Sequence, residues 1–273
     1  MELSVSLFVA VVFLAMICQY MSVSLGVGYG TPLTPILLII GFLPLQIVPA
    51  VLFSQLVGGI VGGLAHHHAG NISLDFKRDE ELIKERLRGL GYLPRSTDSK
   101  VVLALVMCGI VGVLAGVFTA VHISQVALET YIGVLVLAIG MTVLLRRTIG
   151  SGFSWKNIVL LGAIGAFNKG MSGGGYVPLV TGGQIISGRD AKSSVGSTTA
   201  AVAILCAVGF LGYLLIEGDV YWRLVAATSI GSVVAAPFAA MTVKKVSSDK
   251  LKLVIGLFTI ILGIFTLLKV FVF

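Results

Sequence analysis

This 273-residue chain contains few charged residues. Asp, Glu, Lys and Arg make up 11% of its residues, whereas a soluble domain carries about 25%. Scarce charge leaves too little solvated surface for a water-soluble globular protein and excludes that class. Apolar residues make up 57% of the chain and form several runs of about 20 residues, the length that a helix needs to cross a bilayer. Because lipid cannot satisfy free backbone groups, the sequence predicts an all-α polytopic membrane protein.

Metal-binding and catalytic patterns are also missing. Cys18, Cys108 and Cys206 all lie in apolar runs, which favours packing over disulfides or ligation. The run 66–68 is three histidines, but adjacent side chains on a helix point in different directions and do not form a metal site. No dinucleotide-binding loop and no nucleophile–base constellation is visible. We therefore expect no cofactor, no metal and no enzymatic activity.

Two breaks rich in glycine and proline are present at matching places in the two halves. The first is 26–33, GVGYGTPL, and the second is 172–179, SGGGYVPL. A shift of 146 residues superposes Gly28 on Gly174 and Pro32 on Pro178. Paired interruptions of apolar segments indicate the binding site of a secondary transporter.

Hydropathy predicts the same order of segments in both halves, namely a long run, the break, a short segment and three spans. We interpret this as an internal duplication within one membrane domain, with 1–147 as the first repeat and 148–273 as the second. A polar insertion at about 66–100, in which 75–90 is expected to form a charged helix, belongs to the first repeat alone. The apolar segments are expected at 3–25, 32–40, 46–65, 101–120, 126–145, 158–167, 177–186, 191–216, 221–243 and 251–273.

The position of the basic residues predicts the topology. Loops 66–100, 146–156, 187–192 and 244–252 hold 16 of the 19 Lys and Arg residues. If each broken run is a hairpin that enters and leaves on one side, all four loops are cytoplasmic, as the positive-inside rule requires. We therefore predict two inverted-topology repeats, each a broken hairpin plus three transmembrane helices. The net charge of +7 reflects this topology and does not indicate a nucleic-acid partner.

The breaks themselves predict an anion site. Glycine lets backbone approach a ligand closely, and Pro32 and Pro178 suit the first turn of a helix. Each helix start presents unpaired N–H groups and partial positive charge, and two such starts near the midplane would bind an anion. Lys169 precedes the second break inside an apolar run, where an ionisable residue is costly and usually functional. The alternative is a lysine that extends to the membrane interface.

Candidate substrate-binding residues lie in the breaks and on the third segment of each half. Helix–helix hydrogen bonding is an equal alternative for each polar residue taken alone. The candidates are Gly26, Gly28, Tyr29, Gly30, Thr31 and Pro32 in the first break, Lys169, Ser172, Gly173, Gly174, Gly175, Tyr176 and Pro178 around the second, and Gln55, Thr198 and Thr199 on the spans.

The second break, with glycines 173–175 followed by Tyr176 and Pro178, resembles the glycine-triplet-to-proline signature of the sulfite exporter TauE/SafE family of membrane permeases. The first break departs from that signature because Tyr29 separates its glycines. The order and spacing of segments extend the resemblance over essentially the whole chain, apart from the insertion at 66–100. The resemblance implies transport of small sulfur-containing anions such as sulfite or an organosulfonate.

The sequence thus predicts a secondary transporter of a small anion in the prokaryotic plasma membrane, working by alternating access. The alternatives are an anion channel and, less favoured, an intramembrane enzyme. The expected partners are the anion and the lipid bilayer. The sequence leaves open a coupling ion, proton or sodium, and assembly as a homodimer.

Overall fold

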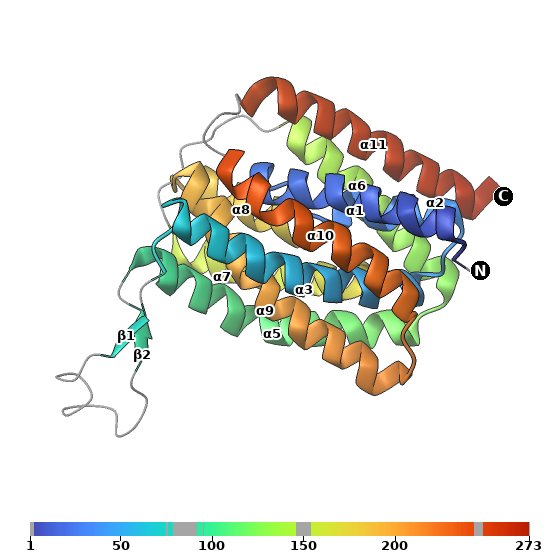
Figure 1. Ribbon diagram of the computed structural model, residues 1–273, viewed down its shortest axis with the longest axis horizontal. Helices are drawn as coiled ribbons and strands as arrows, with labels where there is room; N and C mark the ends of the chain where they lie inside the picture. Colours follow the sequence, from blue (N-terminus) through green and yellow to red (C-terminus); the bar gives the residue numbers. More distant parts are fainter. Residues whose placement is uncertain are drawn as a thin grey trace.

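The computed structural model describes residues 3–74, 76–78, 92–94, 96–145, 154–242 and 248–272. These residues form a bundle of helices, and a two-stranded sheet of β1 (Phe76–Arg78) and β2 (Tyr92–Pro94) projects from one end of it (Figure 1). The first half contributes α1 (Val5–Leu25), α2 (Gly30–Ile40), α3 (Pro44–His68), α5 (Thr97–His122) and α6 (Gln125–Leu145). The second half contributes α7 (Trp155–Ser172), α8 (Tyr176–Ile186), α9 (Ala191–Glu217), α10 (Trp222–Thr242) and α11 (Ser248–Val272).

Most helices agree closely with the segments expected from hydropathy, although α7 covers Trp155–Ser172 where 158–167 was expected. The α-helical membrane fold is confirmed. Their ends carry local signals: Asp190 caps α9 by accepting from the Lys192 and Ser193 N–H groups, and Gly218 ends it with φ of 71°. Such caps satisfy backbone groups that the helix leaves free.

The helix expected over 75–90 is wrong at its start, because residues 76–78 form a strand antiparallel to 92–94. Residues 79–91 lie outside the described part of the chain. Both strands begin with an aromatic residue, Phe76 and Tyr92, and aromatic residues favour strands over helices.

Five helices of the described residues, α1, α3, α5, α9 and α10, are long and apolar enough to cross a membrane. Large apolar side chains cover the outside of the bundle, with Phe13, Phe118, Leu215 and Phe238 more than half exposed. A soluble protein would bury such side chains, so this outer surface is suited to lipid. The protein is therefore an integral membrane protein.

Each broken run is a hairpin. Both ends of the α1–α2 hairpin meet Tyr221, just before α10: the Leu3 N–H donates to its hydroxyl over 3.0 Å, and the Phe42 ring lies 6.2 Å from its ring. The α7–α8 hairpin returns to the start of α5, because Arg189, just after α8, pairs with Asp98.

The two hairpins open toward opposite ends of the bundle. The end of α10 lies near the start of α5, since Asn71 donates to the Ala240 carbonyl and the Ser73 N–H, two residues on, donates to Asp98. The start of α10, where the first hairpin opens, is therefore far from the start of α5, where the second one opens. This arrangement fits the inverted repeats expected from charge, which remain a prediction.

Helix packing between the halves is reciprocal. The first arm of each hairpin packs on the fourth helix of the other half, α1 on α10 and α7 on α5. These contacts are close: a Cβ at Gly231 would lie 2.2 Å from the Val12 carbonyl oxygen, and one at Gly116 would lie 2.3 Å from that of Phe167. Small residues thus let backbones approach, as is common between membrane helices. α3 and α9 pack on each other, and each also contacts the short arm of its own half's hairpin, α2 and α8.

Candidate functional site

The first break starts where glycine ends α1. Gly26 adopts φ of 69° and donates its N–H to the Ser22 carbonyl over 2.9 Å, and Gly28 adopts φ of 92°. Residues other than glycine rarely adopt these positive φ angles. The chain then reverses, and α2 begins at Gly30 with Thr31 and Pro32 buried in its first turn.

The second break repeats this arrangement. Gly173 adopts φ of 69° and caps α7 by donating to the Lys169 carbonyl over 2.9 Å, and Gly175 adopts φ of 80° before α8 begins at Tyr176. Ser172 helps to hold the turn, because its hydroxyl donates to the Asn168 carbonyl and accepts from the Gly174 N–H over 3.1 Å. Both breaks are thus turns that lead directly into a short helix.

The two breaks cross and touch each other. A Cβ at Gly30 would lie 1.8 Å from the Gly173 carbonyl oxygen, and one at Gly28 would lie 2.8 Å from Pro178 Cδ. Two hydrogen bonds also join the breaks: the Thr34 hydroxyl donates to the Ser172 carbonyl over 3.0 Å, and the Gly175 N–H donates to the Thr31 hydroxyl over 3.4 Å. The structure therefore brings the candidate residues of both breaks to one place.

Lys169 lies at this crossing and is 1% exposed. Its ammonium donates to the Gln55 side-chain oxygen on α3 and to the Gly173 carbonyl. Both acceptors are neutral, so neither balances the positive charge of an ammonium. A buried cation held by neutral oxygens is suited to receive an anion.

The tyrosines of the two breaks are both fully buried. The Tyr29 hydroxyl donates to the Thr228 carbonyl over 3.2 Å and accepts from the Ser54 hydroxyl over 3.0 Å. The Tyr176 hydroxyl has no hydrogen-bond partner among the described residues. The two residues thus differ in chemistry although they follow equivalent turns.

Among the described residues, the hydroxyls of the remaining candidates, Thr198 and Thr199 of α9, make no hydrogen bond to either break. The Thr199 hydroxyl donates to the Val195 carbonyl of its own helix, and the Thr198 hydroxyl accepts from the Gln184 side chain over 2.8 Å. Gln184 also accepts from Arg189, so Thr198 belongs to a polar cluster near the end of α8.

That cluster was not expected from the sequence. Arg189 pairs with Asp98 and donates to the Ser197 hydroxyl over 3.2 Å, with its side chain 8% exposed. Burial lowers the pKa of its guanidinium, and the neighbouring Asp98 opposes that shift. The signal in the sequence was an arginine between two apolar segments, which charge counting treated as a topology marker alone. The cluster joins the end of the second hairpin to the start of α5.

The histidine run also has a structural explanation. His66 is fully buried and its Nε2 donates to the Val23 carbonyl over 3.1 Å, just before the first break. Its Nδ1 accepts from Asn71, whose amide also donates to the Ala240 carbonyl. Within the described residues, no group of three metal-ligating side chains is present.

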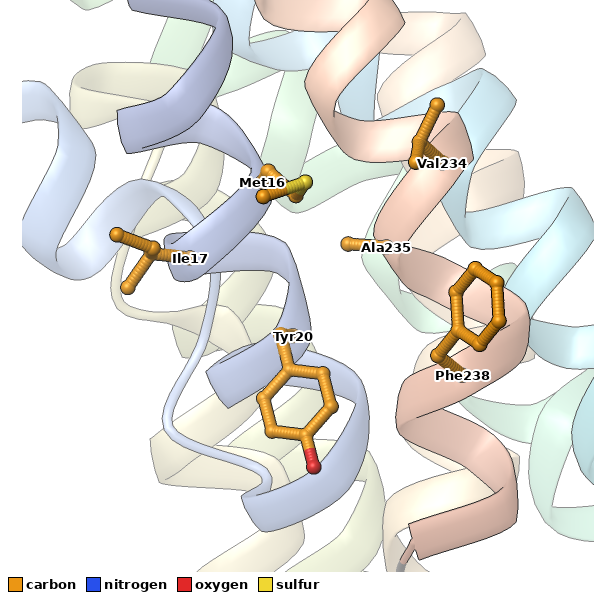
Figure 2. A pocket seen from close by; sticks show the side chains of 6 residues that line it. All are labelled: Met16, Ile17, Tyr20, Val234, Ala235 and Phe238. Atoms are coloured by element: carbon orange, nitrogen blue, oxygen red, sulfur yellow. The ribbon is translucent and has the colours of Figure 1, made fainter.

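A pocket of about 270 Å³ lies elsewhere, between α1 and α10. Figure 2 shows Met16 and Tyr20 of α1 beside Ala235 and Phe238 of α10. Ile17 and Phe238, which also line it, are more than half exposed on the outer surface. Its lining is apolar except for the Tyr20 hydroxyl, so it offers no charge to an anion.

The chain is similar to known membrane proteins. Residues 88–266 match the family of sulfite exporter TauE/SafE. The chain is similar to the probable membrane transporter protein YtnM of Bacillus subtilis (strain 168), with 26% identity over 270 residues. That alignment covers 94% of this chain and 81% of the relative. No solved structure matches the chain.

Proposed function

Since the chain belongs to the sulfite exporter TauE/SafE family of membrane transporters, we propose that it carries a small sulfur-containing anion, such as sulfite or an organosulfonate, across the plasma membrane. The anion binds where the two breaks cross, and its charge is balanced by Lys169. Residues 1–147 and 148–273 act as inverted repeats around that site.

Lys169 is the observation that carries this proposal. A buried ammonium is strongly unfavourable unless a partner compensates it. Gln55 and Gly173 supply two neutral oxygens, and a lysine ammonium has three N–H donors. An anion that accepts from the third donor would supply the missing charge.

The short helices support the same site. α2 and α8 each begin at the crossing with a proline in the first turn, Pro32 and Pro178. N–H groups at a helix start are free of intrahelical partners and carry partial positive charge. Part of that charge is already used, because the Gly175 N–H donates to Thr31. The partial positive charge of the other N–H groups adds to the charge of Lys169.

The hairpins support transport by alternating access. They open toward opposite ends of the bundle and touch at their breaks, the arrangement in which movement of one repeat against the other exposes a fixed site to each side. The chain carries no nucleotide-binding motif. We therefore propose a secondary transporter, driven by a coupling ion, a proton or sodium, or by the gradient of the anion itself.

Substitution of Lys169 tests the proposed function. Lys169→Met keeps the length of the side chain and removes the charge, and we expect sulfite uptake into proteoliposomes to fall by about 10- to 100-fold. Lys192→Met is the matched control, because Lys192 is exposed at the start of α9. Uptake should also saturate with sulfite concentration, which separates a transporter from a channel. Equal uptake by wild type and Lys169→Met would remove Lys169 from the mechanism.

A further inference from the structure

The two break tyrosines are equivalent in position and different in hydrogen bonding. Each follows the glycine turn of its break, and each is 0% exposed. Tyr29 donates to the Thr228 carbonyl and accepts from Ser54, so its hydroxyl is satisfied within the protein. The Tyr176 hydroxyl is equally buried and has no partner among the described residues.

The helices beside the two tyrosines differ at an equivalent position. Thr228, the partner of Tyr29, follows Cys108 by 120 residues, the offset that also superposes Ala115 on Ala235 in the repeat. The residue of the first half that is equivalent to Thr228 is thus a cysteine, and the Tyr176 hydroxyl makes no hydrogen bond to it.

Tyr176 and Lys169 lie together. A Cβ at Gly165, one helical turn before Lys169 on α7, would lie 3.1 Å from Tyr176 Cδ2, so the tyrosine ring packs on that turn. Lys169 also donates to the Gly173 carbonyl, three residues before Tyr176. The ammonium and the unsatisfied hydroxyl donor therefore belong to the same break.

Burying a hydroxyl without a partner is unfavourable. A protein that keeps such a group next to a buried cation is suited to a ligand that accepts from both. We infer that Tyr176 donates a hydrogen bond to the anion bound beside Lys169, and that Tyr29 has a structural role only. This inference rests on the proposed function and deepens it.

The ligand class follows from having two donors. An anion with several acceptor oxygens on one centre, such as sulfite or a sulfonate, can accept from Lys169 through one oxygen and from Tyr176 through another. Tyr176 is then a specificity-determining residue for oxyanions, and the binding site belongs to the second break more than to the first.

Two matched substitutions test the inference, each removing one hydroxyl and keeping the ring. The full-length protein is purified in detergent, and the Kd for sulfite and for sulfoacetate is measured by calorimetric titration. Tyr176→Phe should raise the Kd about 10- to 100-fold. Its melting temperature without ligand should stay equal to or above that of wild type, because the variant loses an unsatisfied buried group.

Tyr29→Phe should give the opposite pattern. It leaves Ser54 without its tyrosine acceptor and removes the donor to Thr228, so the melting temperature should fall while the Kd changes less than about threefold. A Kd for Tyr176→Phe equal to that of wild type overturns the inference and leaves the proposed function intact. An equal loss of affinity in both variants also overturns it. Absence of binding by wild type overturns the proposed function and this inference with it.

Discussion

At the scale of single residues, glycine is required where the backbone of one half touches that of the other. Gly30 begins α2 against the Gly173 carbonyl, and a Cβ there would lie 1.8 Å from that oxygen. This oxygen also accepts from Lys169. A larger residue at position 30 would thus displace both the packing of the hairpins and the acceptor of the buried lysine.

Gly30→Ala tests this requirement. Because the clash is with backbone, relief needs movement of a whole hairpin, and we expect a loss of about 3 kcal/mol or more. Gly63→Ala is the control: its Cβ would lie 3.5 Å from Ala200 Cα, an ordinary contact. The melting temperatures of both purified variants give the comparison. An unchanged melting temperature for Gly30→Ala would contradict the contact between the breaks.

The residues of the breaks could be predicted because clustered glycines followed by a proline interrupt an apolar run at matching places in both halves, and because a lysine is rare inside a membrane span. The partners of these residues could not. Gln55 was a candidate through its polarity alone, and its bond to Lys169 depends on how α3 packs beside α7. Thr199 was a candidate for the same reason, but its hydroxyl donates to the Val195 carbonyl of its own helix.

At the scale of elements, the second hairpin is fastened at its open end. Arg189 follows α8 and pairs with Asp98 in the first turn of α5, while Asp98 also accepts from the Ser73 N–H over 3.0 Å. The Ser96 hydroxyl donates to the Ser73 carbonyl over 2.5 Å. Both ends of the polar insertion are therefore joined to the second hairpin through one carboxylate.

A double-mutant cycle measures this link. Arg189→Met leaves the Asp98 carboxylate partly buried without its cation, and we expect it to cost about 1–3 kcal/mol of stability. Asp98→Asn should cost a similar amount, and the double variant less than the sum, because the two side chains share one interaction. Thermal melts of the four proteins give the coupling. Additive effects would contradict a direct pair.

Element boundaries were predictable within the membrane and failed in the polar insertion. A long apolar run in lipid forms a helix, so the length and composition of the run are enough to predict its structure. Outside lipid no such constraint applies, and the pairing of 76–78 with 92–94 replaces the expected helical start. The helix was expected from the spacing of charged residues, and this spacing does not indicate whether a segment pairs with another strand.

At the scale of the whole molecule, each half holds the first hairpin arm of the other, α1 on α10 and α7 on α5. Hydropathy predicted the order of the apolar helices, and loop charge predicted the hairpins. The reciprocal packing could not be predicted, because an apolar helix surface does not specify which neighbour covers it.

Labelling of single cysteines tests the topology. In a chain with its three native cysteines replaced by alanine, Leu43→Cys and Glu217→Cys should react with an impermeant maleimide added outside intact cells. Lys192→Cys should react only from the cytoplasmic side, in inverted vesicles. All three positions are exposed. Reaction of Leu43→Cys and Lys192→Cys from one face would rule out hairpins that enter from opposite sides.

The contact of Leu3 with Tyr221 joins residues 218 positions apart in the chain. At about 5–20 residues per second of translation, the first hairpin waits roughly 10–40 s in the membrane before α10 is made. During that interval the flank of α1 that will meet α10 has only lipid or the insertion machinery beside it. The first hairpin therefore gains its partner helix only after most of the chain has been made.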